Sequence, residues 1–198
     1  KKKLIDSLKS DGVAVLNYDD EMVRVMGESV QSKVLTYGFG ERADVRAANY
    51  ETRTTNLEEE GVFGFIVFKL SHRGSTVPVK LFNVLGKHQV YSALAAAAVG
   101  IIFNLNSVEI SEGLRTFRFL PGRMRLLKGI KNTLIIDDTY NAAPLSTLAA
   151  LETLQKLEGR RKIAVLGDML ELGHYALEVH GQIGRKAAEV ANLLFCIP

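Results

Sequence analysis

Two neighbouring carboxylates, an aromatic residue and an amide follow an apolar segment at residues 137–141 (Asp-Asp-Thr-Tyr-Asn). Residues 133–136 form a short apolar segment with β-branched side chains, which is typical of a buried strand. Pro144 and the spacing of the leucines after it predict a helix. Open α/β proteins bind ligands on such turns, where side chains and backbone N–H groups converge. The alternative is that Asp137 or Asp138 only caps the helix, although two acids, a tyrosine and an asparagine exceed what a cap requires. The pattern therefore predicts a polar ligand site.

Polar residues also gather at three other places where a predicted strand ends or a predicted helix begins. Residues 17–20 follow the strand-like segment 12–16, and residues 86–92 open an alanine-rich helix. Residues 167–173 leave the strand-like segment 163–166. If that strand neighbours the one before Asp137, the two loops lie at the same edge of the sheet.

Three single residues could have either a functional or a purely structural role. Arg123 has a planar, permanent charge that suits a phosphate or a stacked base, and the alternative is a surface arginine. His88 and His180 are candidate ligands or proton carriers, although a lone helical histidine is more often structural.

Composition excludes several classes of protein. The chain has 198 residues, 47% hydrophobic and 24% charged, and can bury one sizeable core or two small ones. Its single cysteine, Cys196, leaves no internal disulfide and no cysteine-based metal cluster, so a cytoplasmic setting is the default expectation. A net charge of +3 with scattered basic residues does not support nucleic-acid binding. No apolar segment reaches the roughly 20 residues of a membrane span, and no signal peptide is visible.

The order of the predicted elements indicates an α/β fold with two domains, residues 1–117 and 118–198. In the first, residues 61–70 and 76–82 predict an antiparallel hairpin, and Ser107 is predicted to cap a helix at 108–117. The second reads strand, loop, strand, helix, strand, helix, strand, which is the pattern of right-handed βαβ crossovers.

The chain begins at Lys1 without a methionine, in a helical pattern, and ends at Pro198 directly after a strand-like segment. We therefore expect it to be cut from a longer protein. It contains no G-x-x-x-x-G-K-[ST], G-x-G-x-x-G, H-E-x-x-H or G-x-S-x-G motif. The residues alone thus predict an α/β ligand-binding protein whose site is shared between two domains.

Five blocks, in this order, resemble the Mur ligases: VLNYDD at 15–20, GKHQVYSALAAAA at 86–98, PGRMR at 121–125, IDDTYNAAP at 136–144 and VLGDMLELG at 165–173. The last two are most similar to the member that joins D-alanyl-D-alanine to UDP-N-acetylmuramoyl-tripeptide. The resemblance implies the later part of a central ATP-binding domain followed by a truncated Rossmann-like C-terminal domain. It places the phosphate loop upstream of Lys1, so this chain alone is expected to be inactive.

The resemblance implies an ATP-dependent amide ligase of peptidoglycan precursor synthesis. The ATP γ-phosphate passes to the peptide carboxylate, and the incoming amine then attacks the acyl phosphate, with Mg²⁺ stabilising the phosphoryl charge. The implied ATP-binding residues are Asn17, His88, Gln89, Ser92, Arg123, Asp138 and Asn141. The implied residues on the D-alanyl-D-alanine side are Asp168, Met169 and Glu171. No residue is assigned to catalysis or to the metal.

Within this implied site, Asn17 and His88 face the nucleotide and metal region, and Gln89 and Ser92 occupy positions that contact adenine. Arg123 and Asp138 hold the base and the ribose, whereas Asn141 lies near the phosphates and the acceptor. One alternative is a non-catalytic nucleotide-binding module of the same fold. Another is a related ligase such as folylpolyglutamate synthetase, against which the block VLGDMLELG argues. A cytoplasmic monomer with no nucleic-acid or membrane partner is expected.

Overall fold

The computed structural model describes residues 2–54, 64–118, 120–159 and 161–197. They form two compact units, of which the first comprises residues 2–54, 64–82 and 87–118. The second comprises residues 83–86 and 120–197. The division into domains 1–117 and 118–198 stays a prediction, and each unit is described by itself.

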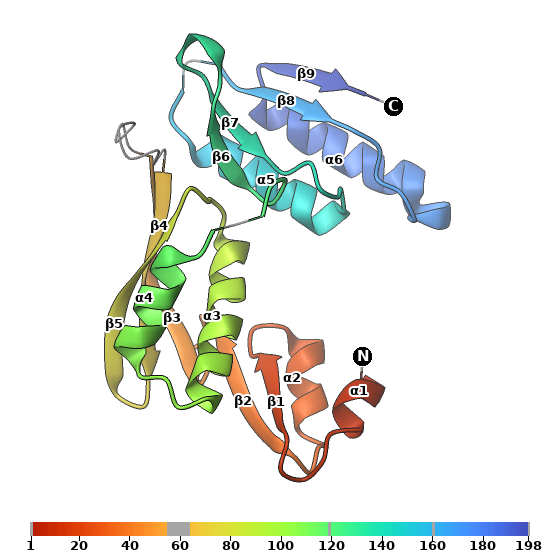
Figure 1. The fold of residues 1–198 in the computed structure, drawn as a ribbon. Coiled ribbons are helices and arrows are strands. Elements are labelled where there is room, and N and C mark those ends of the chain that lie inside the picture. The colour runs from red at the N-terminus through yellow and green to blue at the C-terminus, as the bar shows by residue number, and fades with distance from the viewer. Residues whose placement is uncertain (1, 55–63, 119, 160, 198) are drawn as a thin grey trace. The chain divides into compact units, whose positions relative to one another are not determined.

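A five-stranded mixed sheet is the centre of the first unit (Figure 1). Its strands follow the chain order, with the first three parallel and the last two antiparallel to their neighbours. Buried and more exposed side chains alternate along the fourth strand, as in a sheet with one covered face. The strands are β1 (Val13–Asn17), β2 (Lys33–Gly38), β3 (Val45–Thr54), β4 (Gly64–His72) and β5 (Ser75–Phe82).

The predicted hairpin is confirmed as β4 and β5. Arg73 and Gly74 form a two-residue connection with φ angles of 46° and 80°. Positive φ at both positions is what a type I′ turn requires, and its twist matches that of the flanking strands. Residues 61–63, at the start of the predicted strand, lie outside the described residues.

Helix α3 (Lys87–Ile102) covers the parallel part of this sheet. Its Val90, Leu94, Ala97 and Ala98 are at most 1% exposed. Small alanine side chains allow the helix to approach the strands closely, and thereby fix the position of its first turn. The unit also contains α1 (Lys2–Asp6) and α2 (Glu21–Gly27).

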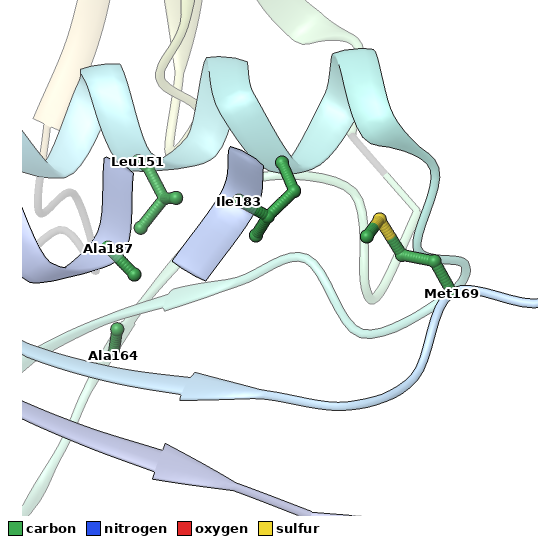
Figure 2. Packing of buried hydrophobic residues seen from close by; sticks show 5 residues of the cluster. All are labelled: Leu151, Ala164, Met169, Ile183 and Ala187. Atoms are coloured by element: carbon green, nitrogen blue, oxygen red, sulfur yellow. The ribbon is translucent and has the colours of Figure 1, made fainter. Parts of the chain in front are cut away.

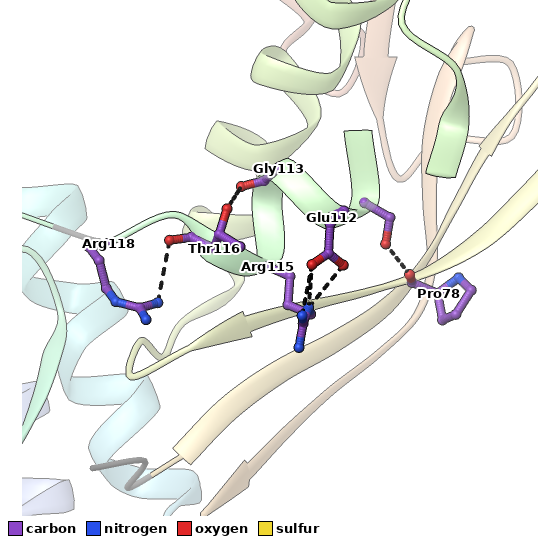
Figure 3. Close-up of polar contacts among 7 residues, drawn as sticks. Pro78, Glu112, Gly113, Arg115, Thr116 and Arg118 are labelled. Carbon is purple, nitrogen blue, oxygen red and sulfur yellow. Dashed lines mark hydrogen bonds and ion pairs between the residues drawn. The ribbon is translucent and has the colours of Figure 1, made fainter. Parts of the chain in front are cut away.

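Helix α4 (Ser107–Thr116) lies on β5, where the Ser111 hydroxyl donates to the Pro78 carbonyl at 2.6 Å. Its exposed side carries an Arg115–Glu112 pair with a 2.7 Å contact (Figure 3). The prediction that Ser107 caps this helix was wrong by one residue. Asn106 accepts hydrogen bonds from the N–H groups of Val108 and Glu109, because its extended backbone aims the side chain at the first turn.

The second unit contains two strand pairs and two long helices. An antiparallel pair, β6 (Arg125–Lys128) and β7 (Leu134–Asp137), precedes α5 (Pro144–Lys156). Helix α6 (Ala176–Val190) then connects the parallel strands β8 (Ile163–Leu166) and β9 (Leu193–Cys196), which gives a βαβ crossover. Short 3₁₀ turns occupy Ile130–Asn132 and Gly173–Tyr175. Residues 83–86 also join this unit, since Leu126 N–H donates to the Asn83 carbonyl at 3.1 Å.

The core of the second unit forms where α5 and α6 pack over β8 (Figure 2). Its buried members are Leu151, Ala164, Met169, Ile183 and Ala187. Met169 enters this core from the loop after β8, so a loop that carries candidate site residues is anchored in the core. Across both units, no helix of the described segments has the length and hydropathy of a membrane span.

Candidate functional site

The predicted site residues lie at strand ends and helix starts in both units. In the first unit, the cluster at residues 17–20 begins with the last residue of β1. The Asn17 side chain accepts the Asp19 N–H at 3.0 Å, which makes a tight turn. Asp20 accepts the Val23 N–H at 3.1 Å and caps α2. Asp20 therefore caps a helix, whereas the side-chain N–H donors of Asn17 make no hydrogen bond to the described residues.

Asp19 joins three segments of the first unit. Its carboxylate accepts the N–H groups of Phe39 at 2.7 Å and Gly40 at 2.9 Å, and the hydroxyl of Tyr91 at 2.9 Å. A Cβ atom on Gly38 would lie 2.8 Å from this carboxylate, so the chain passes too closely for a side chain there. The loops after β1 and β2 are thus fixed to the start of α3.

The electrostatics of this junction agree with its hydrogen bonds. Burial raises the pKa of Asp19, but the donors on Phe39, Gly40 and Tyr91, together with Lys87, lower it overall. Burial and the bond to Asp19 raise the pKa of Tyr91. Asp19 therefore stays an acceptor and Tyr91 a donor at neutral pH.

The first turns of α3 carry the predicted His88, Gln89 and Ser92. His88 and Ser92 are four residues apart and share one face of the helix, whereas Gln89 is only 8% exposed. The buried Nδ1 atom of His88 has no hydrogen-bond partner among the described residues, and burial lowers the pKa of its ring. A buried nitrogen without a partner is unfavourable unless a ligand or water supplies one, so this atom fits a polar ligand at the helix start.

In the second unit, the turn at residues 121–124 is tied to the residues after β7. Asp137 accepts the Gly122 N–H at 3.0 Å, and Asp138 accepts the Met124 N–H at 3.0 Å. Gly122 has a φ of 73°, and a Cβ atom there would lie 2.7 Å from the Tyr140 nitrogen. Only glycine fits this position. The close approach of the turn to the residues after β7 brings Arg123 near Asp138, two of the predicted site residues.

The two adjacent aspartates differ in how many of their oxygens are occupied. Both carboxylate oxygens of Asp137 accept hydrogen bonds, from Gly122 and from the N–H and hydroxyl of Thr139. The Thr139 hydroxyl lowers the pKa of Asp137, and the backbone donors lower it further, against the effect of burial. Asp138 accepts one hydrogen bond, through Oδ1, and its Oδ2 has no partner among the described residues. Asp138 can therefore accept from a ligand hydroxyl.

Burial raises the pKa of Asp138, and Asp137 raises it further, while the Met124 N–H and the Arg123 charge oppose the increase. Arg123 itself lies over the ring of Tyr140, with its guanidinium carbon 4.0 Å from the ring centroid. Tyr140 is 68% exposed. This cation–π contact holds the Arg123 guanidinium at the turn that also positions Asp138, and the stacking of a base on Arg123 stays a prediction.

The alternative in which Asp137 or Asp138 caps the helix is wrong. Ala143 occupies the N-cap of α5, and the Ser146 hydroxyl accepts the Ala143 N–H at 3.2 Å. Pro144 starts the helix without an N–H to satisfy, so a carboxylate is not needed there. The exposed Asn141 lies between this cap and the two aspartates.

The residues of the loop at 167–173 differ in how far they are exposed to solvent. Asp168 and Glu171 are exposed, whereas Met169 is 4% exposed and belongs to the core. Glu171 has a φ of 63°, a left-handed conformation that costs roughly 1 kcal/mol for a residue with a side chain. The loop therefore holds two carboxylates outward at the expense of backbone strain, and the Met169 side chain faces inward.

The condition for the expected adjacency at one sheet edge, that the strand before Asp137 neighbours the strand before this loop, is not met among the described strands. Among the described strands, β7 pairs only with β6 and β8 only with β9. The segments nevertheless meet, because the Thr147 hydroxyl lies 3.9 Å from the Met169 sulfur and Ala142 packs on the same core. Loop 167–173 and the start of α5 thus share one end of the second unit.

The sequence did not predict the structural roles of Tyr91, Asp19 and His180. Asp19 and Tyr91 are 72 positions apart, and neither carries a local signal of the other. His180 accepts the Met169 N–H at 3.1 Å. His180 is the fifth residue of α6, seven positions after the loop at 167–173, and no sequence pattern indicates its bond to that loop.

Two family models match the chain in succession. The Mur ligase middle domain matches residues 1–100, and the Mur ligase, glutamate ligase domain matches residues 122–198. The UDP-N-acetylmuramoyl-tripeptide--D-alanyl-D-alanine ligase of Bacillus subtilis (strain 168) is 34% identical over 185 residues. That alignment covers 93% of the chain and 37% of the relative, so the chain spans less than half of the relative's length.

Solved structures give the same result. The crystal structure of MurF from Acinetobacter baumannii superposes with a TM-score of 0.84 at 27% identity, over 99% of this chain and 41% of that one. MurF ligase from Thermotoga maritima in complex with ADP gives a TM-score of 0.79 at 25% identity, over 98% and 42%. Both units of the chain are covered by these similarities.

Proposed function

Because the chain belongs to the Mur ligase family, we propose that the complete protein carrying these residues is an ATP-dependent amide ligase of peptidoglycan precursor synthesis. We propose UDP-N-acetylmuramoyl-tripeptide and D-alanyl-D-alanine as its substrates. The observation that carries this choice is the similarity to the Bacillus subtilis ligase, which extends over both family domains. The block VLGDMLELG, the basis for preferring this ligase over folylpolyglutamate synthetase, lies in the aligned part of the second domain.

The reaction needs ATP because a carboxylate is a poor electrophile. Transfer of the γ-phosphoryl group to a carboxylate oxygen of the tripeptide releases ADP and gives an acyl phosphate. The amine of D-alanyl-D-alanine then attacks the carbonyl carbon, loses a proton and expels inorganic phosphate as the amide forms. The residues of this chain contribute by binding and orienting these groups.

Nucleotide-binding roles are assigned to a set of residues within each unit, and each unit is considered by itself. Asn17, His88, Gln89 and Ser92 form the set of the first unit, where the unpaired His88 nitrogen supports a polar ligand. Arg123, Asp138 and Asn141 form the set of the second unit. The Arg123 guanidinium suits an adenine ring, and the Asp138 oxygen that has no partner among the described residues suits a ribose hydroxyl. ADP bound to the Thermotoga maritima relative is consistent with a nucleotide ligand.

Magnesium, when bound, would neutralise the phosphate charge that develops during transfer. The described residues contain no group of three or more histidine, cysteine or acidic side chains placed to hold a metal ion. We therefore assign no residue of this chain to the metal.

We assign the D-alanyl-D-alanine side to the loop at residues 167–173. Asp168 and Glu171 are exposed carboxylates that suit the ammonium group of the incoming dipeptide. Met169 contributes to this side through its backbone and by anchoring the loop, because its side chain is buried.

The proposal predicts that phosphate release by the complete protein requires all three substrates. A coupled phosphate assay should show turnover with ATP, UDP-N-acetylmuramoyl-tripeptide and D-alanyl-D-alanine together, and background rates when any one is omitted. Turnover that is supported equally by L-alanine, or by a folate with glutamate, would assign the protein to another ligase. Nucleotide binding without turnover under any of these conditions would favour the non-catalytic module.

A further inference from the structure

Two side chains of the loop at residues 167–173 pack on the core of the second unit, Met169 within it and Leu172 against it. Met169 places its side chain in the core, and its backbone N–H donates to the Nε2 atom of His180 at 3.1 Å. Its neighbours Asp168 and Leu170 are exposed. The position of the exposed carboxylates therefore depends on how the peptide unit at Met169 is held.

The hydrogen bonds of His180 define its tautomer. The Nδ1 atom lies 2.8 Å from the carbonyl oxygen of Ala176, one turn earlier on α6. A carbonyl oxygen can only accept, so Nδ1 carries the proton. The Met169 N–H can only donate, so Nε2 carries the lone pair. Both ring nitrogens are used, and only the neutral ring can make both bonds.

The neutral ring of His180 also makes no hydrogen bond to the Asp168 carboxylate. The Asp168 carboxylate lies 3.8 Å from Nε2, which is too long for a hydrogen bond, and Nε2 has no proton to donate in this tautomer. The Asp168 side chain is 69% exposed. The imidazole thus holds the backbone next to Asp168 without binding its carboxylate, which remains available to a cationic ligand.

We propose that His180 is a positioning residue for the amine substrate of the ligase. It acts through the Met169 N–H, since the peptide unit between Asp168 and Met169 sets the direction of the Asp168 side chain. Without the acceptor, this peptide unit turns to find another partner and carries Asp168 with it. The inference rests on the proposed function in one respect only, that the loop at 167–173 serves D-alanyl-D-alanine.

Two substitutions with side chains of similar size distinguish the loss of the hydrogen-bond acceptor from the loss of packing. His180→Gln keeps an oxygen near the place of Nε2, whereas His180→Leu removes the acceptor and keeps the bulk. In the complete protein, we expect His180→Leu to raise the KM for D-alanyl-D-alanine about 3- to 10-fold, the range for one lost hydrogen-bonded contact. The KM values for ATP and the tripeptide should not change, and His180→Gln should restore most of the loss.

His174 provides the matched control. It is an exposed histidine just after the same loop and stacks on Tyr175, with ring centroids 3.9 Å apart. No hydrogen bond joins it to the loop in the described part of the chain. We expect His174→Leu to leave all three KM values unchanged.

Two structural measurements test His180 independently of turnover. Nitrogen NMR of the wild-type protein should show Nδ1 protonated and Nε2 unprotonated, and a proton on Nε2 would overturn the proposal without any variant. Hydrogen–deuterium exchange of the segment 167–173 should be faster in His180→Leu than in His174→Leu, and equal rates would also overturn it.

The outcomes distinguish the inference from the proposed function. Faster exchange with an unchanged KM for D-alanyl-D-alanine would show that His180 holds the loop but that the loop does not serve the amine, which contradicts the proposal. If the wild-type protein does not use D-alanyl-D-alanine at all, the proposed function fails. The tautomer and exchange measurements then still decide whether His180 holds the loop.

Discussion

Replacing Met169 by alanine should lower the free energy of unfolding of the second unit by about 2–5 kcal/mol, the cost of truncating a large buried side chain. Met169 is 4% exposed and packs with Leu151, Ile183 and Ala187 (Figure 2). The cavity would lie where the loop at 167–173 enters the core, so the loop should also lose its anchor. The family resemblance implies that Met169 lies on the D-alanyl-D-alanine side, and this variant distinguishes a core role from a direct contact with the substrate.

Met169→Leu is the matched control, because it conserves volume and should cost less than about 1.5 kcal/mol. Urea unfolding followed through the amide NMR signals of α5 and α6 is the suitable measurement. The chain has no tryptophan, and its tyrosines lie in both units, so fluorescence would not resolve them. An alanine variant as stable as wild type would contradict the core role. A leucine variant that folds normally but loses affinity for D-alanyl-D-alanine would indicate direct contact.

Asp138→Ala should raise the KM for ATP of the complete protein about 10- to 100-fold, the equivalent of losing a hydrogen bond to a charged group. Asp138 has an unoccupied oxygen and lies beside Arg123, whose charge opposes the effect of burial on its pKa. The variant should therefore remove a ligand contact as well as the bond to Met124.

Asp137→Ala is the matched control for this prediction. Both oxygens of Asp137 are engaged within the chain, so we expect a smaller change in the KM for ATP and a larger share of the effect on stability. Thermal unfolding of both variants, measured beside their steady-state kinetics, separates the two contributions. Equal increases in the KM for ATP at equal stability would contradict the assignment of Asp138 to the ribose.

Local patterns were enough to predict most elements that position the site. The β-branched run before Asp137 became β7, Pro144 became the first residue of α5, and the hairpin of β4 and β5 follows from its turn residues. These features depend on neighbours within a few positions, so periodicity and turn chemistry can reveal them. The Mur ligase family assignment likewise followed from short blocks in a fixed order.

Contacts between distant segments could not be predicted in the same way. Asp19 meets Tyr91 and His180 meets Met169 only once the chain has folded, and no spacing rule links them. The burial of Met169 could not be predicted because the loop also contains Leu170 and Leu172, and no periodic pattern indicates which of the three enters the core. The cap at Asn106 instead of Ser107 shows the usual uncertainty of one residue at a helix end.

The most direct test of the proposed ligase activity follows oxygen atoms through the reaction. UDP-N-acetylmuramoyl-tripeptide labelled with ¹⁸O in its terminal carboxylate should be supplied to the complete protein with ATP and D-alanyl-D-alanine. The proposal predicts that the released phosphate contains one labelled oxygen for each amide formed, because that oxygen bridges carbon and phosphorus in the acyl phosphate. Amide formation with unlabelled phosphate, or phosphate release without an amide product, would contradict it.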